Sequence, residues 1–251
     1  MTTSFAVAKP QSAEQFRLAA TDTNITETTP AAITPAVEQL AAVVGASPPI
    51  FVRVVDDQYG LYGFCNTGVL EKVRNDGGQI CFGWTIWEWP GVFLTAEFHS
   101  LWVDPDGQYA DITPKPQQEP RIVFAPAREY EPDFDFGMRP RNSRLRAYHS
   151  SFKDDELSRR LAKMSDPQRK YEEARAAAKG MTVDELLKQK LAADPLEGLI
   201  DSFLSICEQF DEHRDRLDVH RSGNLLADET LMRLMEKRAK LLARVRDHFR
   251  A

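Results

Sequence analysis

The chain has 251 residues, of which 42% are hydrophobic and 28% charged, and its formal net charge is −6. This composition is typical of a soluble globular protein with one or two cores. The acidic balance argues against a protein that coats nucleic acid, which needs a basic face, so we expect no nucleic-acid partner. No apolar run approaches the ~18–20 residues that a membrane helix needs, so we expect no membrane association either.

The N-terminal sequence and the cysteines indicate the compartment. The start of the chain lacks a basic region followed by an apolar stretch, so we expect no secretory signal. Three cysteines, at positions 65, 81 and 207, are too few and too scattered for a disulfide framework or a four-thiolate zinc site. We therefore expect a reducing, cytoplasmic location, in which a single cysteine is free to serve a chemical purpose.

The first half of the chain predicts an N-terminal arm followed by an α+β domain. Residues 1–33 are rich in Thr, Ala, Gln and Pro and are expected to be disordered. Thr34-Pro35 opens a short apolar helix. The rest, to about residue 135, predicts a small antiparallel sheet with one further helix. We expect strands at residues 50–55, 79–89, 94–103, 109–113 and 121–125, a helix at 65–74, and a domain that spans 34–135.

The second half of the chain predicts a helical module. Residues 126–251 hold 25 Lys/Arg and 24 Asp/Glu, and apolar residues recur with helical spacing from Leu199 to Phe210 and from Leu231 to Phe249. We expect these two helices to pair antiparallel and to pack against residues 154–193 or a second subunit. The module spans residues 150–251, and the basic outer face of its last helix is a candidate surface for a protein partner.

Cys65 is the first candidate for chemistry. It follows a loop that contains two glycines, and it occupies the expected first turn of a helix. There the free backbone N–H groups and the helix dipole favour thiolate over thiol and can hold an oxyanion. A lone cysteine in such a place is more often a small buried hydrophobe, so its neighbours have to decide between the two interpretations.

His99 and Asp111 are the neighbours that favour chemistry. Strand alternation places Glu97, His99 and Leu101 on one face, so that His99 can point out of the core towards the helix that carries Cys65. Asp111 lies on the returning strand of the next hairpin, where its carboxylate would hold the imidazole tautomer. The alternatives are a hydrogen-bonded strand histidine and an aspartate that bonds to backbone at a strand end.

A cysteine at a helix start, a histidine on a strand and an aspartate on the next strand resemble the core of the papain-like superfamily, in its transglutaminase-like branch. The segments at residues 83–91 (GWTIWEWPG), 96–99 (AEFH) and 111–114 (DITP) also resemble an uncharacterised bacterial family with that pattern. The resemblance covers about half of the chain. It implies a papain-like α+β fold and a thiol-based acyl-transfer site at the three residues, but no particular substrate.

The same resemblance implies an oxyanion-hole glutamine a few residues before the cysteine. Gln58 is the candidate, and Asn66 is a second candidate donor. All four tryptophans lie between positions 84 and 102, which indicates a large aromatic core. Trp87 is the candidate for the wall of a groove that holds substrate.

The sequence does not indicate a metal or a cofactor. A mononuclear site from Cys65, Glu97, His99 and Asp111 is chemically feasible, but no Cys-x-x-Cys or His-x-x-x-His pair supports it. We therefore expect neither a metal nor a cofactor.

Two functions follow from these residues. In the first, the protein is a thiol-dependent hydrolase or acyltransferase that acts on an amide or thioester-like bond of a protein or peptide. Cys65 attacks, His99 shuttles the proton and Asp111 orients His99, as in peptidases (thiol proteases), deamidases and transglutaminases. In the second, the triad is a coincidence, and the protein is a non-catalytic interaction module with a helical binding surface. An active-site thiolate would be alkylated near neutral pH far faster than the other two cysteines.

Overall fold

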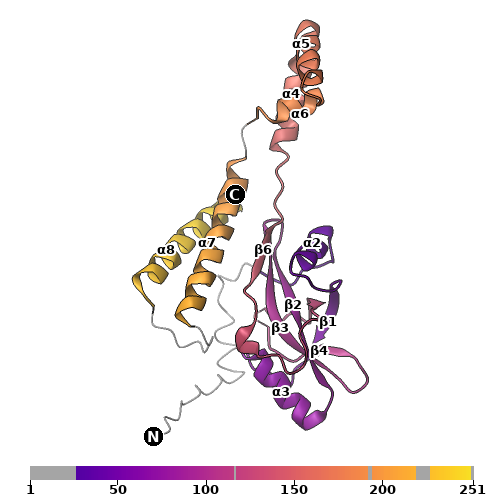
Figure 1. Ribbon diagram of the computed structural model, residues 1–251, viewed down its shortest axis with the longest axis vertical. Coiled ribbons are helices and arrows are strands. Elements are labelled where there is room, and N and C mark those ends of the chain that lie inside the picture. Colours follow the sequence, from indigo (N-terminus) through magenta and orange to yellow (C-terminus); the bar gives the residue numbers. More distant parts are fainter. Residues whose placement is uncertain (1–26, 116, 192–193, 219–226, 250–251) are drawn as a thin grey trace.

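The computed structural model describes residues 27–115, 117–191, 194–218 and 227–249 (Figure 1). Its architecture is mixed α+β, as predicted. The first part of the chain contains α2 (Pro35–Val43), β1 (Ile50–Val54), α3 (Cys65–Asp76), β2 (Gln79–Trp89), β3 (Phe93–Val103), β4 (Tyr109–Asp111), β5 (Arg121–Pro126), the short 3-10 helix η1 (Phe136–Met138) and β6 (Ser143–Arg146). The second part contains α4 (Phe152–Lys163), α5 (Asp166–Ala177), α6 (Val183–Lys188), α7 (Pro195–Leu217) and α8 (Glu229–Phe249).

Five of the strands close into a barrel. The strand order is β2-β5-β1-β4-β3, and β3 pairs with β2 again along the whole hairpin, from Gln79 opposite Val103 to Trp89 opposite Phe93. β6 adds a sixth strand at the edge of β3. β1 and β4 are parallel. The prediction of a small antiparallel sheet is therefore wrong in two respects, the closure of the sheet and this parallel pair.

The closure depends on the short strands β4 and β5. β4 pairs with both β1 and β3, and β5 pairs with both β1 and β2. Alternating apolar residues identify a strand but not its neighbours, so the sequence pattern does not predict which strands meet. All residues from Ile122 to Ala125 are buried, because apolar groups pack on both faces of β5.

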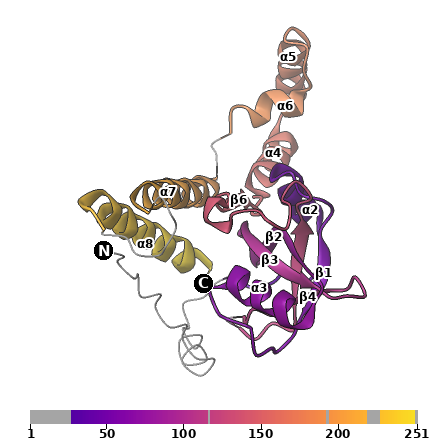
Figure 2. The same cartoon turned by 60° about the horizontal axis from the view of Figure 1, so that its bottom comes forward.

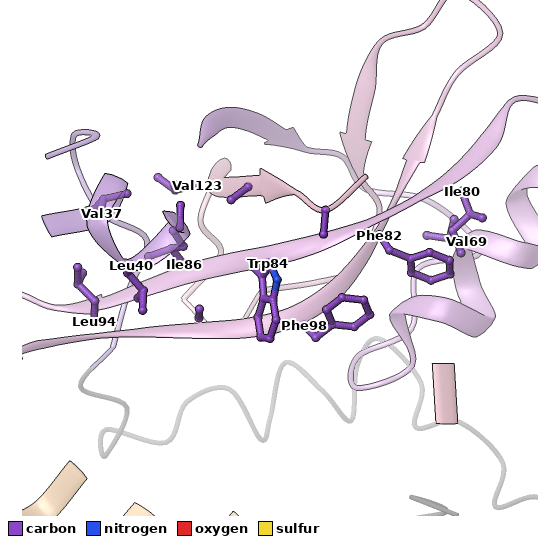
Figure 3. Packing of buried hydrophobic residues seen from close by; sticks show 14 of the residues in the cluster. Val37, Leu40, Val69, Ile80, Phe82, Trp84, Ile86, Leu94, Phe98 and Val123 are labelled. Atoms are coloured by element: carbon purple, nitrogen blue, oxygen red, sulfur yellow. The ribbon is translucent and has the colours of Figure 1, made fainter. Parts of the chain in front are cut away.

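Two apolar cores lie on the two faces of the barrel strands. The inner core is small and lies inside the closed sheet. The outer core joins the sheet to α2 and α3, and Figure 3 shows Phe82 beside Val69 of α3 and Ile86 near Leu40 of α2. The inner core contains Val52, Leu101, Ile122 and Phe124. The outer core includes Val37, Leu40, Val69, Phe82, Trp84, Ile86 and Phe98. This outer packing holds α3, which begins at Cys65, against β3.

Residues 27–33, within the arm expected to be disordered, lie against the barrel. Thr28 forms an antiparallel bridge with Glu88, with N–O distances of 2.8 and 2.7 Å. The Thr29 hydroxyl accepts a hydrogen bond from the Val123 amide at 3.2 Å. Residues 27–33 are therefore ordered, because the barrel backbone forms hydrogen bonds with them that the amino-acid composition of the segment does not predict. Residues 1–26 lie outside the described residues.

α7 and α8 form the predicted antiparallel pair (Figure 2). His213, near the end of α7, bonds to Asp228 just before α8 at 2.9 Å. At the other end of the pair, the ring of Phe249 in α8 lies 6.0 Å from that of Trp89 in the barrel. The sequence predicts the connection between the two helices near Gly223, which lies outside the described residues.

The α7–α8 pair packs on the barrel, whereas the sequence predicts packing against residues 154–193 or a second subunit. Its core includes Val92 and Phe93, at the tip of the β2–β3 hairpin, which are 0% and 2% exposed. An ion pair between Arg144 of β6 and Asp211 of α7, at 2.7 Å, joins the same two parts. The barrel and the α7–α8 pair therefore share one apolar interface.

The helices α4, α5 and α6 form a separate unit that projects from the barrel (Figures 1 and 2). Its own small core contains Leu157, Leu187 and Leu191. Thr182 caps the start of α6 with a capping box, in which its hydroxyl and the Glu185 carboxylate each bond to the other residue's amide. Within the described part of the chain, no helix combines the length and apolar character needed to cross a bilayer.

Candidate active site

Cys65 is the first residue of α3, as predicted. The loop before it is held by close backbone packing: a Cβ on Gly60 would lie 2.1 Å from the carbonyl oxygen of Ile112, and one on Gly68 would lie 2.4 Å from that of Tyr59. These contacts fix the helix start next to the end of β4. The N–H groups of the first turn of α3 have no carbonyl partner within the helix, as at any helix start.

The thiol lies at a gap in the strand pairing of β3. Along this edge β3 pairs with β4 at Trp102 and Val103, and with β6 from Phe93 to Ala96. Between the two ladders, His99 and Ser100 interact with the Cys65 thiol. The gap therefore brings a helix start and a strand edge together at one sulfur atom.

His99 and Asp111 form a buried pair. The His99 Nε2 atom lies 3.0 Å from Asp111 Oδ2, and their side chains are 9% and 0% exposed. Asp111 Oδ1 accepts a second hydrogen bond from the Thr113 amide at 2.8 Å. Because Nε2 is bound to Asp111, the other ring nitrogen, Nδ1, is left for the thiol of Cys65. This is the order expected of a Cys-His-Asp triad.

The electrostatics of the group favour a thiolate–imidazolium pair. Burial raises the pKa of the Cys65 thiol, but the charge of His99, together with polar contacts from His99 and the Ser100 backbone, outweighs it, so the pKa is lowered. Burial lowers the pKa of His99, yet Asp111 and Cys65 raise it to about 9. The pKa of Asp111 falls despite burial, because His99 and Lys115 stabilise its charge.

The other two cysteines behave as structural thiols. Burial raises the pKa of both Cys81 and Cys207 to about 11. Neither lines the cavity that contains Cys65. At neutral pH the three thiols therefore differ in thiolate content, with Cys65 the most ionised.

A cavity of about 450 Å³ opens onto the thiol. Trp87 forms part of its wall, and its indole N–H donates to the Glu97 carboxylate at 2.9 Å. The lining also includes Glu27, Tyr62, Cys65, His99, Lys115 and Arg144. Aromatic and charged groups thus surround one nucleophile in a space large enough for a side chain or a short acyl group.

Gln58 and Asn66, the two predicted oxyanion donors, do not line this cavity. Gln58 lies exposed in the turn before Gly60. Asn66 is the second residue of α3, and successive helical side chains diverge by about 100° around the axis. Backbone N–H groups at the helix start are better placed than either amide side chain to face an oxyanion at Cys65.

Lys115 and Glu27 are two of the cavity residues that were not predicted from the sequence. Lys115, only 4% exposed, lies 2.5 Å from Asp111 Oδ2. Glu27 belongs to the segment expected to be disordered, and burial raises the pKa of its carboxyl group. Lys115 stands between two prolines, where no periodicity signals burial, and Glu27 precedes the first predicted element.

No group of three or more His, Cys, Asp or Glu residues suited to a metal ion occurs among the residues described. No protein-family model, no curated protein and no solved structure matches the chain. The functional interpretation therefore rests on the geometry of the cavity.

Proposed function

We propose that the protein is a thiol-dependent hydrolase or acyltransferase that acts on an amide-type bond of a protein or peptide. One observation carries the proposal: Cys65, at a helix start, shares a cavity with His99, which is hydrogen-bonded to the buried Asp111 at 3.0 Å. The lowered pKa of the Cys65 thiol and the raised pKa of His99 support the same assignment.

The proposed reaction has two stages, in which His99 first donates a proton and later accepts one. The Cys65 thiolate forms a bond to the substrate carbonyl carbon, and the resulting oxyanion is held by first-turn N–H groups of α3. Collapse breaks the C–N bond, and the amine leaves with the proton of the His99 imidazolium. Water, or a second amine in a transfer reaction, then attacks the thioester; His99 takes its proton, and the Cys65 thiolate leaves.

The resemblance to papain-like and transglutaminase-like proteins supports this proposal. The shared feature is a cysteine that opens a helix, with histidine and aspartate on neighbouring strands. In this chain the three positions belong to α3, β3 and β4. We propose that the barrel is a papain-like core with this order of elements.

Alkylation by iodoacetamide at pH 6.5 tests the nucleophile. We expect Cys65 to react at least tenfold faster than Cys81 and Cys207, as measured by mass spectrometry of peptides after timed quenching. The Cys65→Ala variant should lose the fast phase, whereas Cys81→Ala should keep it. Equal rates for the three thiols in folded protein would rule the proposal out.

The orienting aspartate is tested by Asp111→Asn. The amide removes the charge that raises the pKa of His99, so the rate of Cys65 alkylation at pH 6.5 should fall at least tenfold. Asp104→Asn is the matched control, because Asp104 also accepts backbone hydrogen bonds, from Asp106 and Gln108, but lies outside the cavity. An unchanged rate in Asp111→Asn would leave Asp111 with a structural role alone.

An interaction function is the second candidate. It is favoured by the projecting unit α4–α6, whose surface includes Tyr171 at 61% exposure, and by the charged outer face of α8, where Met232 is 55% exposed. These helices would present surface to a protein partner. If Cys65 proves no more reactive than Cys81, this second candidate replaces the first.

A further inference from the structure

Lys115 is buried beside the candidate triad. It follows β4 in the segment Thr113-Pro114-Lys115, and its side chain is 4% exposed. A lysine is almost never buried to this extent unless its charge is paired. Its ammonium lies 2.5 Å from Asp111 Oδ2 and 5.9 Å from the centre of the Trp87 ring.

Lys115 and His99 share one oxygen of Asp111. Oδ2 lies 2.5 Å from Lys115 Nζ and 3.0 Å from His99 Nε2, while Oδ1 accepts from the Thr113 amide at 2.8 Å. The carboxylate is fully buried, so solvent screens neither interaction. The negative charge of Asp111 that acts on His99 is therefore partly offset by the Lys115 ammonium, which contacts the same oxygen.

We propose that Lys115 is a positioning residue of the Cys65–His99 pair: its ammonium holds Asp111 in place and weakens the pull of Asp111 on the His99 proton. This inference rests on the proposed function. It adds Lys115 to the Cys65, His99 and Asp111 group, and the charge of Lys115 balances that of Asp111. Asp111 then orients the imidazole, and His99 can still release its proton to a leaving amine.

Proton transfer explains why such a balance matters. Burial lowers the pKa of His99, Asp111 and Cys65 raise it, and Lys115 lowers it again. A general acid works best when its pKa lies near the working pH. A buried aspartate without Lys115 would hold the imidazolium proton more tightly and would slow its transfer to the leaving group.

The test combines four single variants with an NMR titration of His99. The signal of His99 among the five histidines is assigned by its loss in His99→Gln. Lys115→Gln keeps a hydrogen-bond donor for Asp111 but removes the charge, and Lys115→Arg keeps the charge. Lys72→Gln is the matched control, because Lys72 also forms close ion pairs, with Asp57 and Asp76 at 2.7 and 2.6 Å, but does not line the cavity.

We expect Lys115→Gln to raise the pKa of His99 by about 1 or more, the usual size for loss of a like charge this near. The alkaline limb of the pH profile for Cys65 alkylation should move upward with it. Lys115→Arg and Lys72→Gln should leave both values within about 0.3 of wild type. A His99 pKa unchanged in folded Lys115→Gln would overturn the proposal and leave Lys115 a stabilising ion pair only.

A second comparison applies if Lys115→Gln does not fold. Lys115→Met keeps the length of the side chain without its charge, and Asp111 keeps its bonds to His99 and to the Thr113 amide. The pKa of His99 should again be higher than in the wild-type protein, and an unchanged value would contradict the proposal. The proposed function fails separately, when Cys65 in the wild-type protein reacts no faster than Cys81.

Discussion

At the scale of single residues, the site depends on charges that are buried together. Asp111 is fully buried and bonds to His99, Lys115 and the Thr113 amide. An isolated carboxylate in such a place would be strongly destabilising, whereas a paired and hydrogen-bonded one is tolerated. The same groups that make the burial of Asp111 possible also set the protonation of His99 and, through it, of Cys65.

This coupling predicts a pH-dependent stability. The pKa of folded His99 is about 9, above its ordinary value of 6.5, so protonated His99 stabilises the folded state. That contribution is fully present below pH 6.5 and is lost as the pH rises through 9. Cys65→Ala protein is used so that this thiol does not titrate, and there the Asp111 carboxylate still raises the pKa of His99.

We expect the free energy of unfolding of Cys65→Ala protein to fall as the pH rises above 6.5. The fall should be smaller than the ~3 kcal/mol that a pKa rise from 6.5 to 9 would give, because the thiolate no longer raises the pKa of His99. Urea unfolding followed by circular dichroism measures it at four pH values across this window. The Cys65→Ala/His99→Gln protein is the control and should show a flatter profile. Parallel profiles for the two proteins would mean that Asp111 does not raise the pKa of His99.

At the scale of elements, the sequence predicts the pieces of the site better than their assembly. The helix at Cys65 and the strand at His99 are recognisable because a loop with glycines precedes one and apolar alternation marks the other. The barrel closure is not, because it depends on β4 and β5 each joining two strands that lie far apart in the sequence. Lys115 is likewise unpredictable, since only the folded chain brings its ammonium to Asp111.

The packing of the loop before α3 against the end of β4 leads to a prediction about Gly60. A Cβ at this position would lie 2.1 Å from the Ile112 carbonyl oxygen, and backbone on both sides leaves little room to adjust. We expect Gly60→Ala to cost about 1–3 kcal/mol of stability. The rate of Cys65 alkylation should fall as well, because the strain shifts the helix start relative to Asp111.

Gly198→Ala provides the control for that variant. Nothing lies within 4 Å of a Cβ at Gly198, in the first turn of α7, so alanine should be neutral or slightly stabilising there. Thermal unfolding and the alkylation rate are measured for both variants. Wild-type behaviour of Gly60→Ala would show that the loop can move without loss of the site.

At the scale of the whole molecule, the two parts of the helical half differ in their relation to the barrel. α7 and α8 bury Val92 and Phe93, and α7 is joined to β6 by ion pairs, including Arg146 with Asp201 at 2.8 Å. α4, α5 and α6 have a core of their own. A helical module over residues 150–251 thus contains one part that completes the barrel fold and one part that projects from it.

The ends of the projecting unit lie next to each other. The Ser150 amide donates to the Glu197 carboxylate at 3.0 Å, and the Ser150 side chain hydrogen-bonds to Asp194. The chain therefore leaves and re-enters the barrel–hairpin body at one place, as an inserted unit does. Removal of residues 152–193 and closure with a short Gly-Ser linker should not strain the remainder.

We expect the protein without residues 152–193 to remain folded and monomeric and to keep the fast alkylation of Cys65, because no residue of the cavity is removed.

Truncation after Asp194 is the contrasting variant. It removes α7 and α8, exposes Val92 and Phe93, and leaves Arg144 without Asp211, so aggregation is expected. Size-exclusion chromatography with light scattering, together with the alkylation rate, distinguishes the two proteins. A soluble truncated protein with reactive Cys65 would show that the barrel is stable without α7 and α8. Aggregation of the protein without residues 152–193 would make α4–α6 part of the main fold.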